Sequence, residues 1–166
     1  MPGAWRCAAC HADPACPVCP AYRLARVDSR ARPSAAIDFY VSVLGATERM
    51  RMAAPGGRIG HAELQLGTSI VMLADEFPDV GFRSPKAVGG TPMTLHVYVE
   101  DVDAVFADAL AKGARELRAV KDEFYGDRTG RFEDPFGHRW SVASHVEDVS
   151  EHEMAKRAEE ATQSGG

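Results

Sequence analysis

Histidine and carboxylate side chains alternate with apolar residues in segments 61–66 and 94–99. Successive side chains of a strand point to opposite faces, so each segment would present a polar row on one face. The side chains in these rows that could do chemistry are His61, Glu63, His96 and Tyr98. An imidazole and a carboxylate can serve as an acid/base pair or bind a divalent metal ion. A histidine on a strand can equally be a hydrogen-bonded cavity or surface residue, and the pattern leaves both interpretations open.

A second group of candidates could hold a small molecule. The guanidinium of Arg128 offers a planar, bidentate fork for an anionic group. Its alternative role is a salt bridge to Asp127 or Glu133. Three aromatic side chains could wall a binding site, although aromatic residues in strands are often plain core: Phe124, Tyr125 and Trp140.

Two Cys-x-x-Cys pairs lie before residue 20, at Cys7/Cys10 and Cys16/Cys19. Four thiolates in two pairs suit tetrahedral zinc, although only five residues separate the pairs. Cys7, Cys10 and His11 also match the pattern of c-type haem attachment, which requires export, and no signal peptide is visible. Our prediction for residues 1–20 is a disordered Cys/Pro-rich extension, with zinc and haem as alternatives.

Residues 21–146 must supply the elements that position these candidates. The order strand, helix, three strands is predicted twice, at 22–27, 34–45, 47–52, 61–66 and 70–73, and again at 94–99, 101–113, 115–120, 128–133 and 139–145. Ser34 and Asp101 are the expected N-caps of the two helices. The basic segment 22–27 is the weakest of the predicted strands. Residues 147–166 are polar and predict a surface helix with a frayed tail.

Length and composition narrow the function class. The chain has 166 residues, 45% hydrophobic and 26% charged, which suits one globular domain. A net charge of −5 without a basic stripe gives no sign of nucleic-acid binding. No run of about 18 apolar residues predicts a membrane span. Because all four cysteines precede residue 20, the folded body is expected to be cytoplasmic.

Several motifs resemble the vicinal oxygen chelate (VOC) superfamily, which includes glyoxalases, bleomycin-resistance proteins and dioxygenases. They are Ala-Ile-Asp-Phe-Tyr at 36–40 with Val-Leu-Gly-Ala at 43–46, Leu-His-Val-Tyr-Val-Glu-Asp-Val-Asp at 95–103, Tyr-Gly-Asp-Arg at 125–128 and Glu-Asp-Pro-Phe-Gly-His-Arg-Trp at 133–140. Together they look closest to the PhnB-like subgroup.

The resemblance implies an α+β fold of two tandem βαβββ modules, at about residues 21–74 and 93–146. These modules would form a curved mixed β-sheet with a concave cavity, often completed by a partner in a homodimer. Metal-dependent members bind a divalent ion such as Zn, Ni, Mn or Fe through ligands on the first and last strands of each module.

The ligand set carried over by the resemblance is incomplete. Glu63 and His96 occupy ligand positions, but the other two fall on Ala25 and on Ser141, where metal enzymes usually carry glutamate. A catalytic metal needs about three protein ligands. His61, His138 and His145 are the available substitutes.

Three functional interpretations follow. The first is a protein that binds or transforms a small polar metabolite or drug, possibly with a metal, in which Glu63 and His96 are the catalytic and metal-binding candidates. Its substrate-binding candidates are His61, Tyr98, Tyr125, Arg128, Trp140 and Ser141. The second is a metal-free binding protein that sequesters its ligand without catalysis. The third is a chain whose function is lost because its first strand is disrupted.

Overall fold

The computed structural model describes residues 22–27 and 33–164, and the predicted extension with its cysteines lies outside them. The chain divides into two compact units. The first contains residues up to Pro92 together with Phe136–His138, and the second contains Met93–Pro135 and the residues from Arg139 onward.

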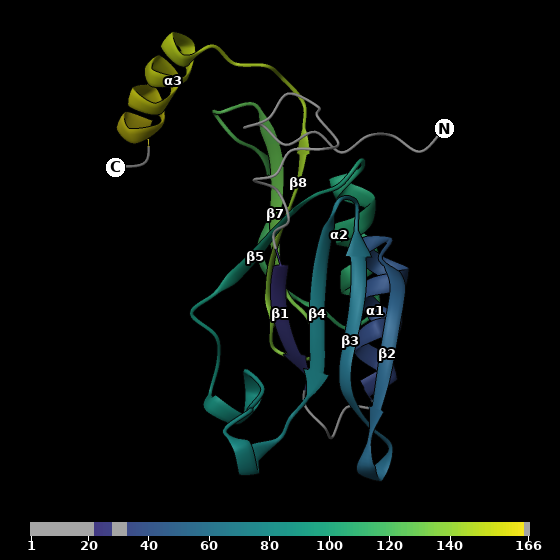
Figure 1. Ribbon diagram of the computed structural model, residues 1–166. Helices are drawn as coiled ribbons and strands as arrows, with labels where there is room; N and C mark the ends of the chain where they lie inside the picture. Colours follow the sequence, from purple (N-terminus) through teal and green to yellow (C-terminus); the bar gives the residue numbers. More distant parts are fainter. Residues whose placement is uncertain (1–21, 28–32, 165–166) are drawn as a thin grey trace. The chain divides into compact units, whose positions relative to one another are not determined.

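The first unit is a four-stranded sheet with a helix packed on one face (Figure 1). Its elements are β1 (Tyr22–Val27), α1 (Pro33–Leu44), β2 (Thr47–Ala54), β3 (Arg58–Leu66) and β4 (Ser69–Asp75), with short 3-10 turns at Pro55–Gly57, Pro78–Val80 and Lys86–Val88. The strand order is β1-β4-β3-β2, and β1 runs parallel to β4. Because β1 pairs with β4 along its whole length, the pairing argues against a disrupted first strand.

The second unit repeats this topology. Its elements are β5 (Thr94–Tyr98), α2 (Val102–Ala111), β6 (Arg115–Asp122), β7 (Asp127–Glu133), β8 (Arg139–His145) and α3 (Glu151–Ser164). The strand order β5-β8-β7-β6, with β5 parallel to β8, matches that of the first unit. The predicted duplication of strand, helix and three strands is confirmed, as is a helix near the C-terminus.

The helix starts differ in one respect from the sequence prediction. Asp101 caps α2 as expected, because its carboxylate accepts a hydrogen bond from the backbone N–H of Ala104 at 2.9 Å. Ser34, however, is the second residue of α1, which begins at Pro33. Proline suits the first helical position because its φ is already helical and the absent N–H would have no partner there.

Each helix buries its apolar stripe against one face of its own sheet. In the first unit, Ile37 and Tyr40 of α1 are buried, as are Ala62 and Leu64 of β3. In the second unit, the apolar side of α2 packs on β6, β7 and β8. The buried side chains of this second core are Leu95, Val102, Phe106, Ala109, Phe132, Trp140 and Val142.

The turn between β7 and β8 contributes to the core of the first unit. The Phe136 ring lies edge-on to Phe39 and Tyr40, with centroid distances of 6.2 and 6.3 Å. His138 is buried, and its Nδ1 lies 3.2 Å from the Tyr40 hydroxyl. His138 therefore serves the packing of this unit, and its suggested role as a substitute metal ligand does not fit its surroundings.

Two buried carboxylates fix the end of β4 and the loop that follows it. Asp75, the last residue of β4, accepts a hydrogen bond from the backbone N–H of Ile59 on β3 at 2.6 Å, and Glu76 accepts one from the N–H of Ser84 in the loop at 2.5 Å. Burial raises the pKa of Asp75, and the Ile59 N–H opposes that rise only in part. Among the described residues, the second carboxylate oxygen of Asp75 is buried and has no hydrogen-bond partner.

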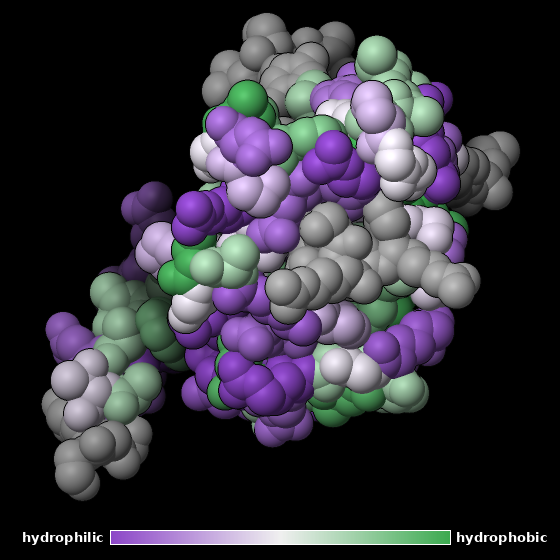
Figure 2. All heavy atoms as spheres, turned by 90° about the horizontal axis from the view of Figure 1, so that it is seen from below, coloured by the Kyte–Doolittle hydropathy of each residue, from purple (hydrophilic) through white to green (hydrophobic). Residues whose placement is uncertain are grey.

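On the face seen in Figure 2, hydrophilic residues predominate and hydrophobic residues form small separate patches. Within the described residues, none of the helices combines the length and apolar character needed to cross a membrane.

The backbone of β7 passes very close to α2 at Gly130. A Cβ atom at this position would lie 2.8 Å from the Phe106 ring and 2.8 Å from a Val120 methyl group. We expect Gly130→Ala to lower the free energy of unfolding by about 1–3 kcal/mol, because the core must shift to admit the methyl group. Urea denaturation measures the loss. The control is Gly60→Ala on β3, where the nearest atom lies 3.4 Å away, and an equal loss in both variants would contradict the packing argument.

Candidate functional site

The second sheet has one face against α2 and one face away from it. On β7, Gly130 and Phe132 face α2, since a Cβ at Gly130 would meet Phe106 and the Phe132 ring lies 6.1 Å from the Phe106 ring. Alternation along the strand therefore turns Thr129 and Arg131 to the opposite side. We call this side the polar face; by strand register it carries His96, Tyr98, Arg115, Arg118, Lys121, Asp127, Thr129, Arg131, Glu133, Arg139, Ser141 and His145.

Strand pairing arranges these side chains in rows across the sheet. In one row His96 pairs with Ser141, which pairs with Arg131, which pairs with Arg118. Paired residues on one face have Cβ atoms about 5 Å apart, so neighbours in a row can contact the same small molecule. The predicted candidates His96 and Ser141 are thus adjacent, and His96 is exposed while Ser141 is buried.

A hydrogen-bonded chain runs from Tyr98 to the end of β8. The Tyr98 hydroxyl donates to Oδ2 of Asp127 at 2.6 Å. The other oxygen of Asp127 lies 2.9 Å from Nδ1 of His145, whose Nε2 lies 2.9 Å from Asp148. The His96 ring packs edge-on to Tyr98, with a centroid distance of 5.0 Å. Because the Tyr98 proton is directed at Asp127, the hydroxyl oxygen can act only as an acceptor toward any other group.

The two carboxylates around His145 change its protonation. Asp127 first, and Asp148 second, raise the pKa of the His145 imidazole above its ordinary value. When the ring is protonated, it donates to both carboxylates and compensates the charge of the buried Asp127. Tyr98 is therefore held by a carboxylate that has its own counter-charge.

A second cluster occupies the β6 side of the polar face. Arg118 contacts the carboxylate of Glu123 and the hydroxyl of Thr129, and that hydroxyl donates to Glu123 at 3.0 Å. Among the described residues, the Nε atom of Arg118 is buried and has no hydrogen-bond partner, which is unfavourable.

The first unit holds the other predicted row, on β3. His61 and Glu63 lie on the face opposite the buried Ala62 and Leu64. The Glu63 carboxylate lies 3.6 Å from His61 and 3.7 Å from Arg49. Its charge is thus partly compensated within the first unit.

The donor set does not fit the divalent metal that the family resemblance implies. In the second unit, the residues in line with His96 are a serine and then the cationic Arg131, which would repel a metal ion. In the first unit, Ala25 on β1 pairs with Leu73 on β4, and neither residue has a ligating side chain. Among residues 22–27 and 33–164, no three His, Cys, Asp or Glu side chains gather closely enough to hold a metal ion.

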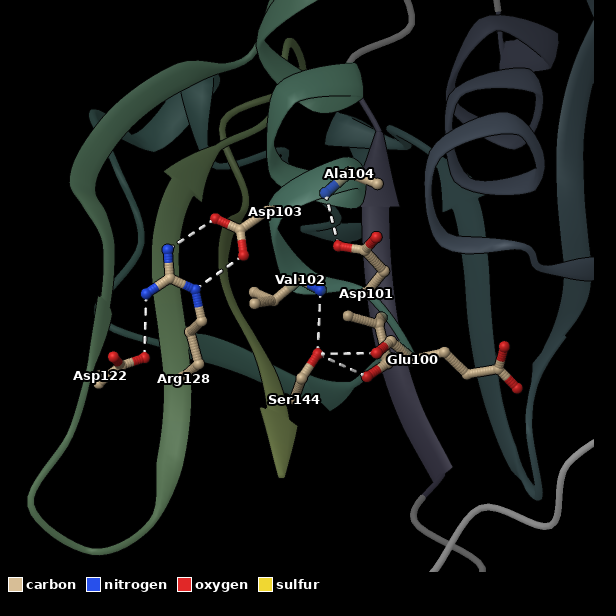
Figure 3. A network of polar contacts seen from close by, with 9 residues as sticks. Glu100, Asp101, Val102, Asp103, Ala104, Asp122, Arg128 and Ser144 are labelled. Carbon is tan, nitrogen blue, oxygen red and sulfur yellow. Dashed lines mark hydrogen bonds and ion pairs between the residues drawn. The ribbon is translucent and has the colours of Figure 1, made fainter. Parts of the chain in front are cut away.

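Arg128 lies on the α2 side of β7, away from the polar face (Figure 3). It makes two hydrogen bonds to Asp103, of 2.7 and 2.8 Å, and one of 2.9 Å to Asp122. These pairs raise the pKa of Arg128 and lower that of Asp103. The predicted alternative of a salt bridge was right in kind but wrong in its partners, which are Asp103 and Asp122 instead of Asp127 or Glu133. Because Asp103 and Asp122 already engage its guanidinium, Arg128 is not available to bind an anionic ligand.

Ser144 completes this structural network beside the start of α2. Its hydroxyl accepts a hydrogen bond from the Val102 N–H and donates to the carbonyl of Val99, both at 2.9 Å. Figure 3 shows its hydroxyl bonded to the Val102 N–H and to carbonyls just after β5, while the Asp101 carboxylate is bonded to Ala104. The network fixes the β5–α2 connection on the α2 side of the sheet.

The aromatic candidates divide between core and surface. Trp140 is buried on the α2 side of β8, and its indole N–H donates to Asp134 at 2.9 Å. The prediction that Trp140 lines a binding site is therefore wrong, because its side chain lies in the core. Tyr125 and Phe124 lie in the turn just before Asp127, with ring centroids 5.2 Å apart.

Sequence reasoning missed Asp127, Thr129 and Arg131 as members of the polar face. Segment 127–133 does not alternate visibly, because a glycine and an arginine stand at two of the positions that face α2. The signal that could have revealed these residues is the glycine itself, since a strand glycine often marks a close approach of another element.

A protein-family comparison decides the family. Residues 29–142 match the model of the Glyoxalase/Bleomycin resistance protein/Dioxygenase superfamily. The chain belongs to this superfamily. The resemblance noted from the sequence motifs is thereby confirmed, together with the fold that it implied.

Individual relatives agree with this assignment. Rv0887c of Mycobacterium tuberculosis (strain ATCC 25618 / H37Rv), itself uncharacterized, is 44% identical over 124 residues, which cover 73% of this chain and 73% of that protein. The crystal structure of TioX from Micromonospora sp. ML1 has a TM-score of 0.56 at 30% identity, covering 75% of this chain and 98% of TioX. A PhnB protein from Bacillus cereus, titled a putative 3-demethylubiquinone-9 3-methyltransferase, has a TM-score of 0.57 at 19% identity and covers 74% and 97% of the two chains. At that identity it shows the fold alone.

The His145 ion pairs should stabilise the protein in a pH-dependent way. Because the pKa is raised in the folded state, the stabilisation is fully present below the unfolded-state value of about 6.5 and is lost as the pH rises through the folded value. We expect His145→Gln to lower the free energy of unfolding by about 0.5 kcal/mol near pH 5.5, and by less at pH 9. Urea titrations at several pH values measure this, with His152→Gln on α3 as control. A loss that grew with pH would contradict the assignment.

The Arg128 network should matter for stability and not for ligand binding. We expect Arg128→Gln to lower the midpoint of thermal unfolding, because Asp103 and Asp122 then repel each other without a cation between them. The deficit should shrink in high salt. Melting curves at low and high sodium chloride test this. If the variant melted like the wild type but lost ligand affinity, Arg128 would belong to the binding site after all.

Proposed function

We propose that this chain is a metal-free binding protein that holds a small polar molecule on the polar face of its second unit. The observation that carries the proposal is the row His96, Ser141 and Arg131, which offers an imidazole, a hydroxyl and a guanidinium side by side. These groups form hydrogen bonds with a ligand, whereas a divalent metal ion needs carboxylate, thiolate or neutral imidazole ligands.

Tyr98 would supply the complementary contact. Its hydroxyl proton is directed at Asp127, so the oxygen accepts a hydrogen bond from the ligand. The face thus offers an oriented acceptor beside several donors. Such a small number of placed polar groups is typical of sites that recognise small molecules.

Tyr125, in the turn next to Asp127, remains a candidate of the same proposal. Glu63 and His61 lie on the face of the first sheet opposite the buried Ala62 and Leu64, and they remain candidates for ligand binding by the first unit. The superfamily resemblance also implies a homodimer, and the placement of all four cysteines before residue 20 favours a cytoplasmic location. Light scattering on the eluting peak of a sizing column tests the dimer.

The first experiment compares metal content and ligand binding. The protein is purified over a chelating resin, its metal content is measured, and a set of neutral, cationic and anionic small molecules is screened by thermal shift and calorimetry. We expect binding without added metal. His96→Ala should weaken it about tenfold, or ~1.4 kcal/mol, with little change in melting temperature, because His96 is exposed.

Two variants provide the controls for this experiment. Near-stoichiometric metal that is lost only when Glu63 and His96 are both replaced by alanine would overturn the metal-free proposal. Metal lost only in Cys7→Ser/Cys10→Ser would instead locate a zinc site in the N-terminal cysteines and leave the proposal standing. Turnover of a bound compound would show an enzyme in place of a sequestering protein.

A further inference from the structure

Arg131 differs from the other cations of the polar face. It is exposed, and it makes no hydrogen bond or ion pair with the part of the chain that the structure describes. In register it stands between the Ser141 hydroxyl and the guanidinium of Arg118. A free guanidinium beside a second one is unfavourable, because like charges on paired strand positions repel.

The neighbouring basic side chains of this face already have acidic partners. Arg118 and Lys121 share Glu123, and His145 lies against Asp127. Arg115 and Arg139 share Glu133 at 3.1 and 3.8 Å. The carboxylates are thus engaged elsewhere, and the charge of Arg131 is not compensated within the described residues.

A further feature near Arg131 favours a negative guest. Beside Arg131 in the row stands Ser141, at the position where the superfamily resemblance leads one to expect a glutamate. A neutral hydroxyl there removes a carboxylate that would repel an anion, and it can donate a hydrogen bond itself.

We propose that the polar face binds an oxyanion, the carboxylate or phosphate group of a small molecule, with Arg131 as its principal partner. Arginine suits this role because its planar fork matches both groups in a bidentate manner. Ser141 and His96 extend the same row of donors, while Tyr98 accepts from another part of the ligand. The inference rests on the proposed function, since it specifies the ligand of the same face.

Because the net charge of the chain is −5, anion binding at the polar face has to come from individual side chains and not from the charge of the whole protein. A protein with excess negative charge does not attract anions over its whole surface. Binding should therefore depend on the individual guanidinium and not on the total charge. This distinction determines the choice of control.

The test is calorimetric titration of the full chain with inorganic phosphate and, separately, with succinate. A Tris buffer with about 20 mM sodium chloride limits screening, and metals are removed with a resin because a soluble polycarboxylate chelator would compete. We expect one or both probes to bind, with the phosphate and succinate arms showing which oxyanion is preferred. Arg131→Gln should weaken binding about tenfold, or ~1.4 kcal/mol. Arg131→Lys should give an intermediate loss, because it keeps the charge but not the fork.

The matched control is Arg115→Gln on the same face, which removes one positive charge whose partner Glu133 also has Arg139. We expect it to leave affinity unchanged. Without anion, Arg131→Gln should melt no lower than the wild type, because it removes a repulsion with Arg118. Absence of binding by both probes, unchanged affinity in Arg131→Gln, or an equal loss in Arg115→Gln would overturn the inference.

The two proposals can fail separately. If a neutral or cationic compound from the screen binds independently of Arg131 but depends on His96, the proposal of oxyanion binding fails and the proposal of a metal-free site stands. If anion binding depends on Arg131 but requires added metal, the proposal of a metal-free site fails and the role of Arg131 stands.

Discussion

The packing of Phe106 on the backbone at Gly130 is the contact on which the second unit depends. It brings α2 onto β7 so closely that no side chain fits between them. Once that face of β7 is committed to the helix, alternation sends Asp127, Thr129 and Arg131 to the other face. Pairing with β6 and β8 then places these residues in rows with Arg118, Ser141 and His145. The chemistry of the polar face follows from a steric constraint on the opposite side of the sheet.

Charge pairing separates the structural polar residues of this unit from those available to a ligand. On the α2 side, Arg128 is held by two carboxylates, and Ser144 is held by backbone groups at the start of the helix. On the polar face, Asp127 orients Tyr98 and is itself compensated by His145. Arg131 stands apart from these pairs. The same residue type therefore serves stability at position 128 and is available for binding at position 131.

The superfamily fold is compatible with the metal-free function proposed above. Its two βαβββ units are preserved, as the sheet orders show, whereas two of the four ligand positions implied by the resemblance carry alanine and serine. Fold alone does not determine function, because function resides in the side chains placed on the fold. Replacing a carboxylate by serine beside an arginine changes the kind of guest that the sheet favours, from a cation to an anion.

The sequence by itself determined the order of the elements, because hydrophobic period, turn glycines and the Asp101 cap are local signals. It also determined the family and the adjacency of the polar rows on single strands, such as His61 with Glu63 and His96 with Tyr98. The bounds of most strands differ from prediction by a few residues, as at β3, whose ends lack a sharp change in pattern.

Only the tertiary structure decided which side of a strand each residue occupies where alternation is masked. Arg128 looked like an anion clamp and Trp140 like the wall of a site, since nothing local shows that both face a helix. Arg131 was missed for the converse reason, because its lack of a partner among the described residues depends on charges spread over three strands. Pairing register and charge compensation are properties of residues far apart in the chain, and a linear pattern does not contain them.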